Sequence, residues 1–263
     1  MSDWLRHDLR DGVATLTFNR PDRLNALTFE IYAELRDRLT ELAHTPAAHV
    51  ILVTGEGRGF CSGGDVEEII GQLVQREAGE LLEFTRMTGA VTRALRECPQ
   101  PVIAAMNGVA AGAGSVIALA SDFRLLARSA AFAFLFTRVG LAGADMGSAY
   151  LLPRLVGLGR ATELLMLGER VSAERALEIG LATQVVDDAE LLTTAEQLAR
   201  RLADGPALAL KATKTALTRE LDSDLAGAIE LEAITQAHLM QSQDFTEFYR
   251  AWSEKREPRW RGR

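Results

Sequence analysis

Apolar and polar positions along the first half of the chain predict strands separated by helices. Residues Val13–Phe18 alternate with the period of a strand. Apolar side chains recur with helical spacing over residues 28–42, and Thr28 is a residue type that caps helix N-termini. Further short strands are predicted at residues 49–54, 102–106, 122–127 and 131–134. Strands that alternate with helices indicate βαβ units and a mainly parallel sheet.

The second half of the chain is mostly helical in its pattern. Helical spacing of apolar residues covers residues 161–167, 173–179, 189–203, 206–217, 224–240 and 245–255. Residues 66–96 are also predicted to be helical, with an interruption near 71–79, and Pro99 and Pro101 end that stretch. We therefore predict an α/β core over residues 1–200 and a helical C-terminal region over residues 201–263.

The composition argues against several kinds of binding partner and several cell compartments. The formal charge of −7 argues against general binding to nucleic acid or a membrane surface, so a polyanionic ligand would need a local basic patch. Two cysteines are too few for a disulfide framework, and the first eight residues lack the apolar core of a signal peptide. We expect a cytoplasmic protein. The longest apolar stretch, residues 102–120, contains Asn107 and three glycines, which favours buried core over a membrane span.

Two glycine-rich segments follow predicted apolar strands. The first is Phe60-Cys61-Ser62-Gly63-Gly64-Asp65, and the second is Gly112-Ala113-Gly114 at a predicted helix start. Small residues at such places leave backbone N–H groups open to a ligand. A site of this kind suits an anion or a developing oxyanion.

Together with other segments, these loops resemble the crotonase (enoyl-CoA hydratase/isomerase) family over nearly the whole chain. The matching segments are residues 19–21, 25–27, 60–65, 103–108, 112–114, 121–123, 152–157 and 176–181. The resemblance implies a spiral of βαβ units with a C-terminal helical trimerisation region, assembled as a homo-trimer or hexamer. It also implies that the N–H groups of Gly64 and Ala113 stabilise a thioester enolate. Coenzyme A is then part of the substrate, and no separate cofactor or metal is expected.

The same resemblance implies contacts to coenzyme A. The adenine and phosphates would be held by the loop that carries Arg23, Leu24 and Ala26, together with the backbone around Gly63 and Asp65. Trp252 and Lys255 occupy the places of an aromatic residue and a lysine that the family commonly uses, sometimes from a neighbouring subunit. Arg23 suits a phosphate by its charge. The alternative for Arg23 and Lys255 is a solvated surface charge, and for Trp252 a packed helix face.

The acid/base residues decide the reaction. Hydratases of this family add water with two glutamates, but Val116 and Phe136 stand at those places here. Neither side chain can transfer a proton. Asp145 matches the position of the catalytic acid in some isomerases of the family, although one extra residue separates it from Gly140.

A single carboxylate can remove a proton from one carbon and return it to another. We expect an apolar pocket of Leu141, Met146, Val116 and Phe136 to raise the pKa of Asp145. Asp145 is also a suitable N-cap for a helix starting near Met146. Another branch of the family uses an aspartate near this position as a nucleophile in dehalogenation.

The favoured prediction is double-bond isomerisation of an enoyl-CoA, with Asp145 as acid and base. The alternatives are an enoyl-CoA hydratase with a variant mechanism and a catalytically silent acyl-CoA-binding homologue. A dinucleotide-binding fold is weakly supported, because Ile117 replaces the third glycine of the fingerprint. A serine hydrolase lacks its nucleophile elbow, and Cys61 is interpreted as a small buried residue.

Overall fold

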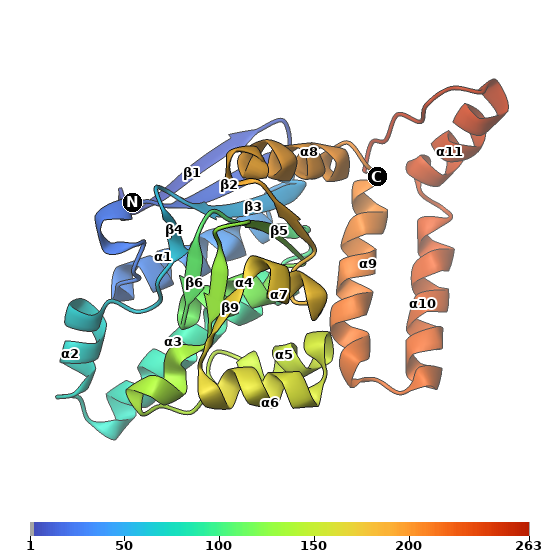
Figure 1. The fold of residues 1–263 in the computed structure, drawn as a ribbon. Coiled ribbons are helices and arrows are strands. Elements are labelled where there is room, and N and C mark those ends of the chain that lie inside the picture. The colour runs from blue at the N-terminus through green and yellow to red at the C-terminus, as the bar shows by residue number, and fades with distance from the viewer. Residues whose placement is uncertain (1–2, 263) are drawn as a thin grey trace.

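Two β-sheets form the centre of the molecule in the computed structural model, which describes residues 3–262 (Figure 1). Residues 1–2, the start of the segment inspected for a signal peptide, lie outside the described part. The first sheet has the order β1 (Leu5–Arg10), β2 (Val13–Phe18), β3 (Val50–Gly55), β5 (Val102–Met106), β7 (Phe123–Ala127) and β10 (Gln184–Val186). The second has the order β4 (Gly59–Cys61), β6 (Val109–Ala111), β8 (Ala131–Ala133) and β9 (Arg170–Ser172). Only β1–β2 and β8–β9 pair antiparallel within them.

Successive strands of the chain alternate between the two sheets. β3 is followed by β4, β5 by β6, and β7 by β8, so each turn adds one strand to each sheet, parallel to the strand before it. α3 (Ala78–Glu97) connects β4 to β5, and α4 (Ala113–Ala120) connects β6 to β7. This arrangement confirms the predicted α/β spiral.

The N-terminal elements follow the pattern of apolar residues closely. α1 (Phe29–Ala43) buries Ile31, Leu35 and Leu39 on one face, and the Thr28 hydroxyl accepts the Ile31 N–H as an N-cap. The interruption predicted near residues 71–79 is confirmed: a π-helical turn, Val66–Ile70, leads into α2 (Gly71–Leu73), and α3 begins only at Ala78. β1 was not predicted, since only Leu5 of its six residues is buried and no alternation marks it.

Helices dominate the second half, as expected. They are α5 (Ser148–Val156), α6 (Leu158–Leu167), α7 (Ala173–Glu178), α8 (Leu191–Ala203), α9 (Ala207–Arg219), α10 (Leu225–Leu239) and α11 (Gln243–Glu254). α8 packs against β3, β5 and β7, whereas α9, α10 and α11 lie to one side of the sheets (Figure 1). The predicted boundary between the α/β core and the C-terminal region, at residue 200, falls in the last turn of α8 and stays a prediction.

α9 is anchored to the rest of the chain by a buried side chain, whereas α10 has no buried residue. Lys214 of α9 is buried, and its Nζ donates to the carbonyls of Leu95 and Gln100 at 2.9 and 2.8 Å and pairs with Asp122 at 2.8 Å. No residue of α10 is buried, although the helix is rich in apolar side chains. α10 thus presents apolar surface that the described part of the same chain does not cover.

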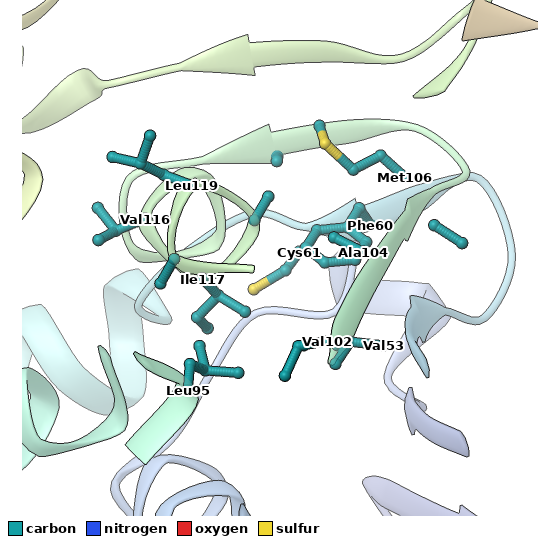
Figure 2. Packing of buried hydrophobic residues seen from close by; sticks show 14 of the residues in the cluster. Val53, Phe60, Cys61, Leu95, Val102, Ala104, Met106, Val116, Ile117 and Leu119 are labelled. Atoms are coloured by element: carbon teal, nitrogen blue, oxygen red, sulfur yellow. The ribbon is translucent and has the colours of Figure 1, made fainter. Parts of the chain in front are cut away.

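The apolar stretch 102–120 forms the core between the sheets and α4. All residues of α4 and β5 are buried. Figure 2 shows the packing of a continuous cluster that includes Val53, Phe60, Cys61, Val102, Met106, Val116 and Ile117. Among residues 3–262, no helix is both long and apolar enough to cross a bilayer.

Candidate active site

The two glycine-rich loops meet at the ends of neighbouring parallel strands. Gly64 follows β4, and Ala113 opens α4 directly after β6. The parallel bridge between Leu27 and Gly64 uses the Gly63 carbonyl and the Asp65 N–H, so the Gly64 N–H points away from it. The Ala113 N–H, at the first position of a helix, has no intrahelical acceptor. The two predicted donors therefore lie on adjoining loops.

Close backbone contacts fix the separation of these loops. A Cβ on Gly63 would lie 2.8 Å from the Ala111 carbonyl oxygen and 3.4 Å from the Ala113 nitrogen. A Cβ on Gly114 would lie 2.1 Å from the Cys61 carbonyl oxygen, far inside van der Waals contact. Gly63 also has a φ of +90°, which side chains rarely adopt. Only glycine at both positions allows the loops to approach this closely.

Buried charges hold the first loop. Asp65 accepts the N–H groups of Glu67 and Glu68 at 3.0 and 3.1 Å, and Arg20 pairs with it at 3.3 Å. Burial raises the pKa of Asp65, but these N–H donors and the Arg20 charge outweigh burial and lower it below the ordinary value. The Asp65 side chain is therefore an ionised structural group, and its backbone is also paired: its N–H donates to the Leu27 carbonyl, and its carbonyl accepts the N–H groups of Ile69 and Ile70.

The residues predicted to hold coenzyme A lie together around this loop. A cavity of about 330 Å³ is lined by Arg23, Ala26, Ser62, Gly64, Asp65, Val66 and Glu67. The Leu24 carbonyl accepts the Ser62 N–H at 3.0 Å, which joins the two segments that form the cavity. Arg23 pairs with Glu67 at 3.1 Å where both side chains are exposed. An exposed pair of this kind is weak, so a phosphate can replace the glutamate.

The C-terminal residues of the predicted coenzyme A site lie elsewhere in the chain. Trp252 is 70% exposed on α11 and stacks on Tyr249, and Lys255 follows the end of that helix with a φ of +53°. α11 lies across the molecule from β4 and α2 (Figure 1). One chain does not bring Trp252 and Lys255 to the cavity, and their role stays a prediction that requires a neighbouring subunit.

Asp145 lies in a turn just before α5. Its Oδ1 accepts the Met146 N–H at 2.8 Å, its carbonyl accepts the Ser148 N–H at 2.8 Å, and its own N–H donates to the Ser148 hydroxyl at 3.1 Å. α5 begins at Ser148 with Gly147 as N-cap, so the prediction that Asp145 caps this helix is wrong. Within residues 3–262, no hydrogen bond reaches Oδ2, which leaves that oxygen available for proton transfer.

Asp145 is partly buried. Burial raises the pKa of Asp145 above its ordinary value, although the Met146 N–H opposes the shift. Val116, Phe136 and Met146 are buried, as expected for an apolar wall. Leu141 is 55% exposed, so its predicted place in that wall is wrong: it lies in the surface turn after the short helix Leu135–Val139.

Tyr32, a residue of α1, lies beside the first loop. Its hydroxyl oxygen lies 3.8 Å from the place that a Cβ on Gly64 would occupy. The negative charge of Asp145 contributes to the raised pKa of this hydroxyl, after burial, so the carboxylate lies within electrostatic range of it. Tyr32 was missed from the sequence because its position beside Ile31 fits the buried face of a helix. In the sequence, only its hydroxyl group distinguishes it from an ordinary residue of the hydrophobic core.

Cys61 does not act as a nucleophile at neutral pH. Burial raises the pKa of its thiol to about 12, despite the opposing Gly63 N–H. Its side chain lies in the cluster beneath α4 (Figure 2). In the part of the chain that the structure describes, no three His, Cys, Asp or Glu side chains are grouped to hold a metal ion.

Comparison with known proteins identifies the family of this site. The enoyl-CoA hydratase/isomerase family model matches residues 8–263. The chain belongs to the enoyl-CoA hydratase/isomerase family. It is similar to the 1,2-epoxyphenylacetyl-CoA isomerase of Escherichia coli K12, with 38% identity over all of both chains. It is equally similar, at 38% identity over 98% of each chain, to a probable enoyl-CoA hydratase of Rhodobacter capsulatus.

A solved structure is more similar still. The crystal structure of a putative enoyl-CoA hydratase from Streptomyces coelicolor A3(2) shares 59% identity, with a TM-score of 0.98 over 100% of this chain and 96% of the other. Members of the enoyl-CoA hydratase/isomerase family that resemble this chain thus carry both kinds of name. The family is one of enzymes, and its two kinds of name do not decide between isomerisation and hydration.

Proposed function

We propose that this protein moves a carbon–carbon double bond of an acyl-CoA thioester through an enolate, with Asp145 as acid and base. The proposal is supported by Asp145, which has a carboxylate oxygen without a hydrogen bond in the described part of the chain and a charge that reaches the Tyr32 hydroxyl near Gly64. Val116 and Phe136 stand where a hydratase needs its glutamates, and neither can move a proton. One carboxylate is sufficient for isomerisation.

The proposed reaction starts with a 3-enoyl-CoA whose thioester oxygen accepts the N–H groups of Gly64 and Ala113. Oδ2 of Asp145 takes a proton from C2, and the electron pair moves onto the thioester oxygen to give a dienolate. The two N–H donors stabilise that oxyanion. The protonated Asp145 then returns the proton to C4, the double bond comes to lie between C2 and C3, and the carboxylate is regenerated.

Substrate binding and assembly belong to the same proposal. Arg23 and the backbone of its loop hold the phosphates of coenzyme A, with Trp252 and Lys255 supplied by a neighbouring subunit. The exposed apolar side chains of α10 support a homo-trimer or hexamer in which this helix is covered by another copy. The proposed reaction only moves a proton from C2 to C4 of the substrate, so it requires no additional cofactor.

Replacement of Asp145 by Asn tests the reaction. Asparagine keeps the size of the side chain but cannot exchange a proton, so turnover of 3-hexenoyl-CoA should fall by roughly 10²–10⁴-fold. Affinity for hexanoyl-CoA, measured by calorimetry, should stay within about twofold, because Asp145 is not needed for binding. Asp204→Asn, at an exposed residue after α8, serves as the matched control. Full activity in Asp145→Asn would exclude this residue as the proton carrier.

Hydration is the second candidate, favoured by the names of the Rhodobacter and Streptomyces proteins. Mass spectrometry in heavy water separates it from isomerisation. Isomerisation changes the mass of the acyl-CoA only by exchanged deuterium, whereas hydration adds the mass of one water. The assay should include 1,2-epoxyphenylacetyl-CoA, the compound named for the Escherichia coli relative. Binding of hexanoyl-CoA without conversion of any substrate would instead favour a silent binding protein.

A further inference from the structure

Tyr32 is a buried residue whose hydroxyl is a hydrogen-bond donor beside the proposed site. Tyr32 is 3% exposed, and its ring packs edge-on against Phe84 of α3, with 6.0 Å between the ring centres. Ile69 lies on the same side of Gly64 as the hydroxyl oxygen. A phenylalanine would make the same ring contacts, so packing does not account for the hydroxyl.

No described residue accepts a hydrogen bond from this hydroxyl. Burial raises the pKa of Tyr32 well above its ordinary value, and the negative charge of Asp145 adds to this, so the group stays a neutral donor. A donor without an acceptor becomes unfavourable once water is excluded from it. Water can serve as the acceptor in the free enzyme, but an acyl chain that enters this space displaces it.

The acceptor in the complex must then come from the substrate. The thioester oxygen has two lone pairs, and the N–H groups of Gly64 and Ala113 take both in the proposed binding mode. The hydroxyl oxygen lies 3.8 Å from the place of a Cβ on Gly64 and within electrostatic range of Asp145, which in the proposed binding mode is near the carbons that exchange protons. A hydrocarbon chain offers no acceptor there.

We propose that Tyr32 selects acyl-CoA substrates that carry an oxygen on the acyl chain near C3 or C4, as a hydroxyl, epoxide or carbonyl. This inference rests on the proposed position of the acyl group between the Gly64–Ala113 donors and Asp145. Tyr32 donates to that oxygen, and a plain enoyl chain leaves the donor without a partner.

The test compares binding of hexanoyl-CoA, 3-hydroxyhexanoyl-CoA and 4-hydroxyhexanoyl-CoA by calorimetry. Wild-type protein should bind at least one hydroxy compound about five- to tenfold more tightly than hexanoyl-CoA, the range expected for one net hydrogen bond. Tyr32→Phe should remove this preference, while its affinity for hexanoyl-CoA stays equal or rises. The melting temperature should not fall, because the lost hydroxyl has no partner in the free protein.

Tyr150→Phe is the matched control, since it removes a hydroxyl that pairs with Asp222 at 2.6 Å on an exposed face. It should leave the preference unchanged. Absence of a preference in wild type, or a preference that persists in Tyr32→Phe, would overturn the proposal. Equal weakening of all three ligands in Tyr32→Phe would also overturn it, because the hydroxyl would then serve the thioester or Asp145. Failure of hexanoyl-CoA itself to bind would contradict the proposed acyl-CoA function instead.

Discussion

Replacement of Gly114 by alanine tests whether the two loops form one rigid oxyanion site. The new methyl group would lie 2.1 Å from the Cys61 carbonyl oxygen and 2.8 Å from its carbonyl carbon. An ordinary contact needs about 3.4 Å, so the β4 loop and the start of α4 must separate by roughly 1 Å. Both atoms at the contact belong to backbone, which no side-chain rotation can relieve.

The cost should appear in catalysis more than in folding. Overpacking of this kind destabilises by about 1–3 kcal/mol, which a chain of this size tolerates. A 1 Å error in the position of catalytic groups can cost about 10²-fold in rate. We therefore expect Gly114→Ala to fold and to convert 3-hexenoyl-CoA roughly 10²-fold more slowly, because Gly64 and Ala113 no longer reach the same oxygen.

The assay follows the ultraviolet absorbance of the conjugated 2-hexenoyl thioester, with unfolding of the same samples measured by circular dichroism. Gly159→Ala is the matched control, since Gly159 lies at the exposed start of α6 and a Cβ there has no neighbour within 4 Å. That variant should keep its rate. A folded Gly114→Ala protein with the wild-type rate would refute the conclusion that the close contact between the loops sets the oxyanion site.

Three further predictions concern stability, pH and assembly. Lys214→Met leaves two buried carbonyls and one oxygen of Asp122 without their partner, so the free energy of unfolding should fall by about 3 kcal/mol. The melting temperature in calorimetry should fall by roughly 6–12 °C. An unchanged melting temperature would contradict the structural role of Lys214. Asp145 must be ionised to take the first proton, and burial raises its pKa. The acid limb of kcat/KM should therefore have its midpoint above 3.8, with activity gained as the pH rises; a midpoint below 3.8 would argue against Asp145. Ile229→Glu places a charge on the uncovered face of α10, so light scattering should show smaller assemblies than wild type; an unchanged mass would exclude this helix from the interface.

Much of the fold was predictable because burial leaves a clear mark on the sequence. β5 is apolar throughout, since both of its faces are covered, and α1 carries an N-cap and one apolar face. The glycine-rich loops were predictable for a related reason: Gly63 and Gly114 are required by backbone contacts that no other residue permits. The apolar patterns depend on neighbours close in the sequence, and the glycines show in the sequence through their residue type even though the contacts that require them come from distant segments.

The chemistry around Asp145 depends on residues far apart in the chain and was predicted less well. Leu141 is apolar, but the turn that carries it faces solvent, and no local pattern indicates this. Tyr32 has the spacing of a core residue, and its hydroxyl gains meaning only when the fold places it near Gly64 and Asp145. The direction of a side chain toward a distant partner is a property of tertiary structure.

The alternation of strands between two sheets has a consequence for how this molecule can change. Gly64 and Ala113 extend from β4 and β6, adjacent strands whose spacing is set at about 4.8 Å by backbone hydrogen bonds. Their separation is therefore independent of most side chains. Tyr32 and Asp145, in contrast, belong to α1 and to the turn before α5, outside this ladder. Proton transfer and substrate choice can be altered one residue at a time while the pair of donors stays in place.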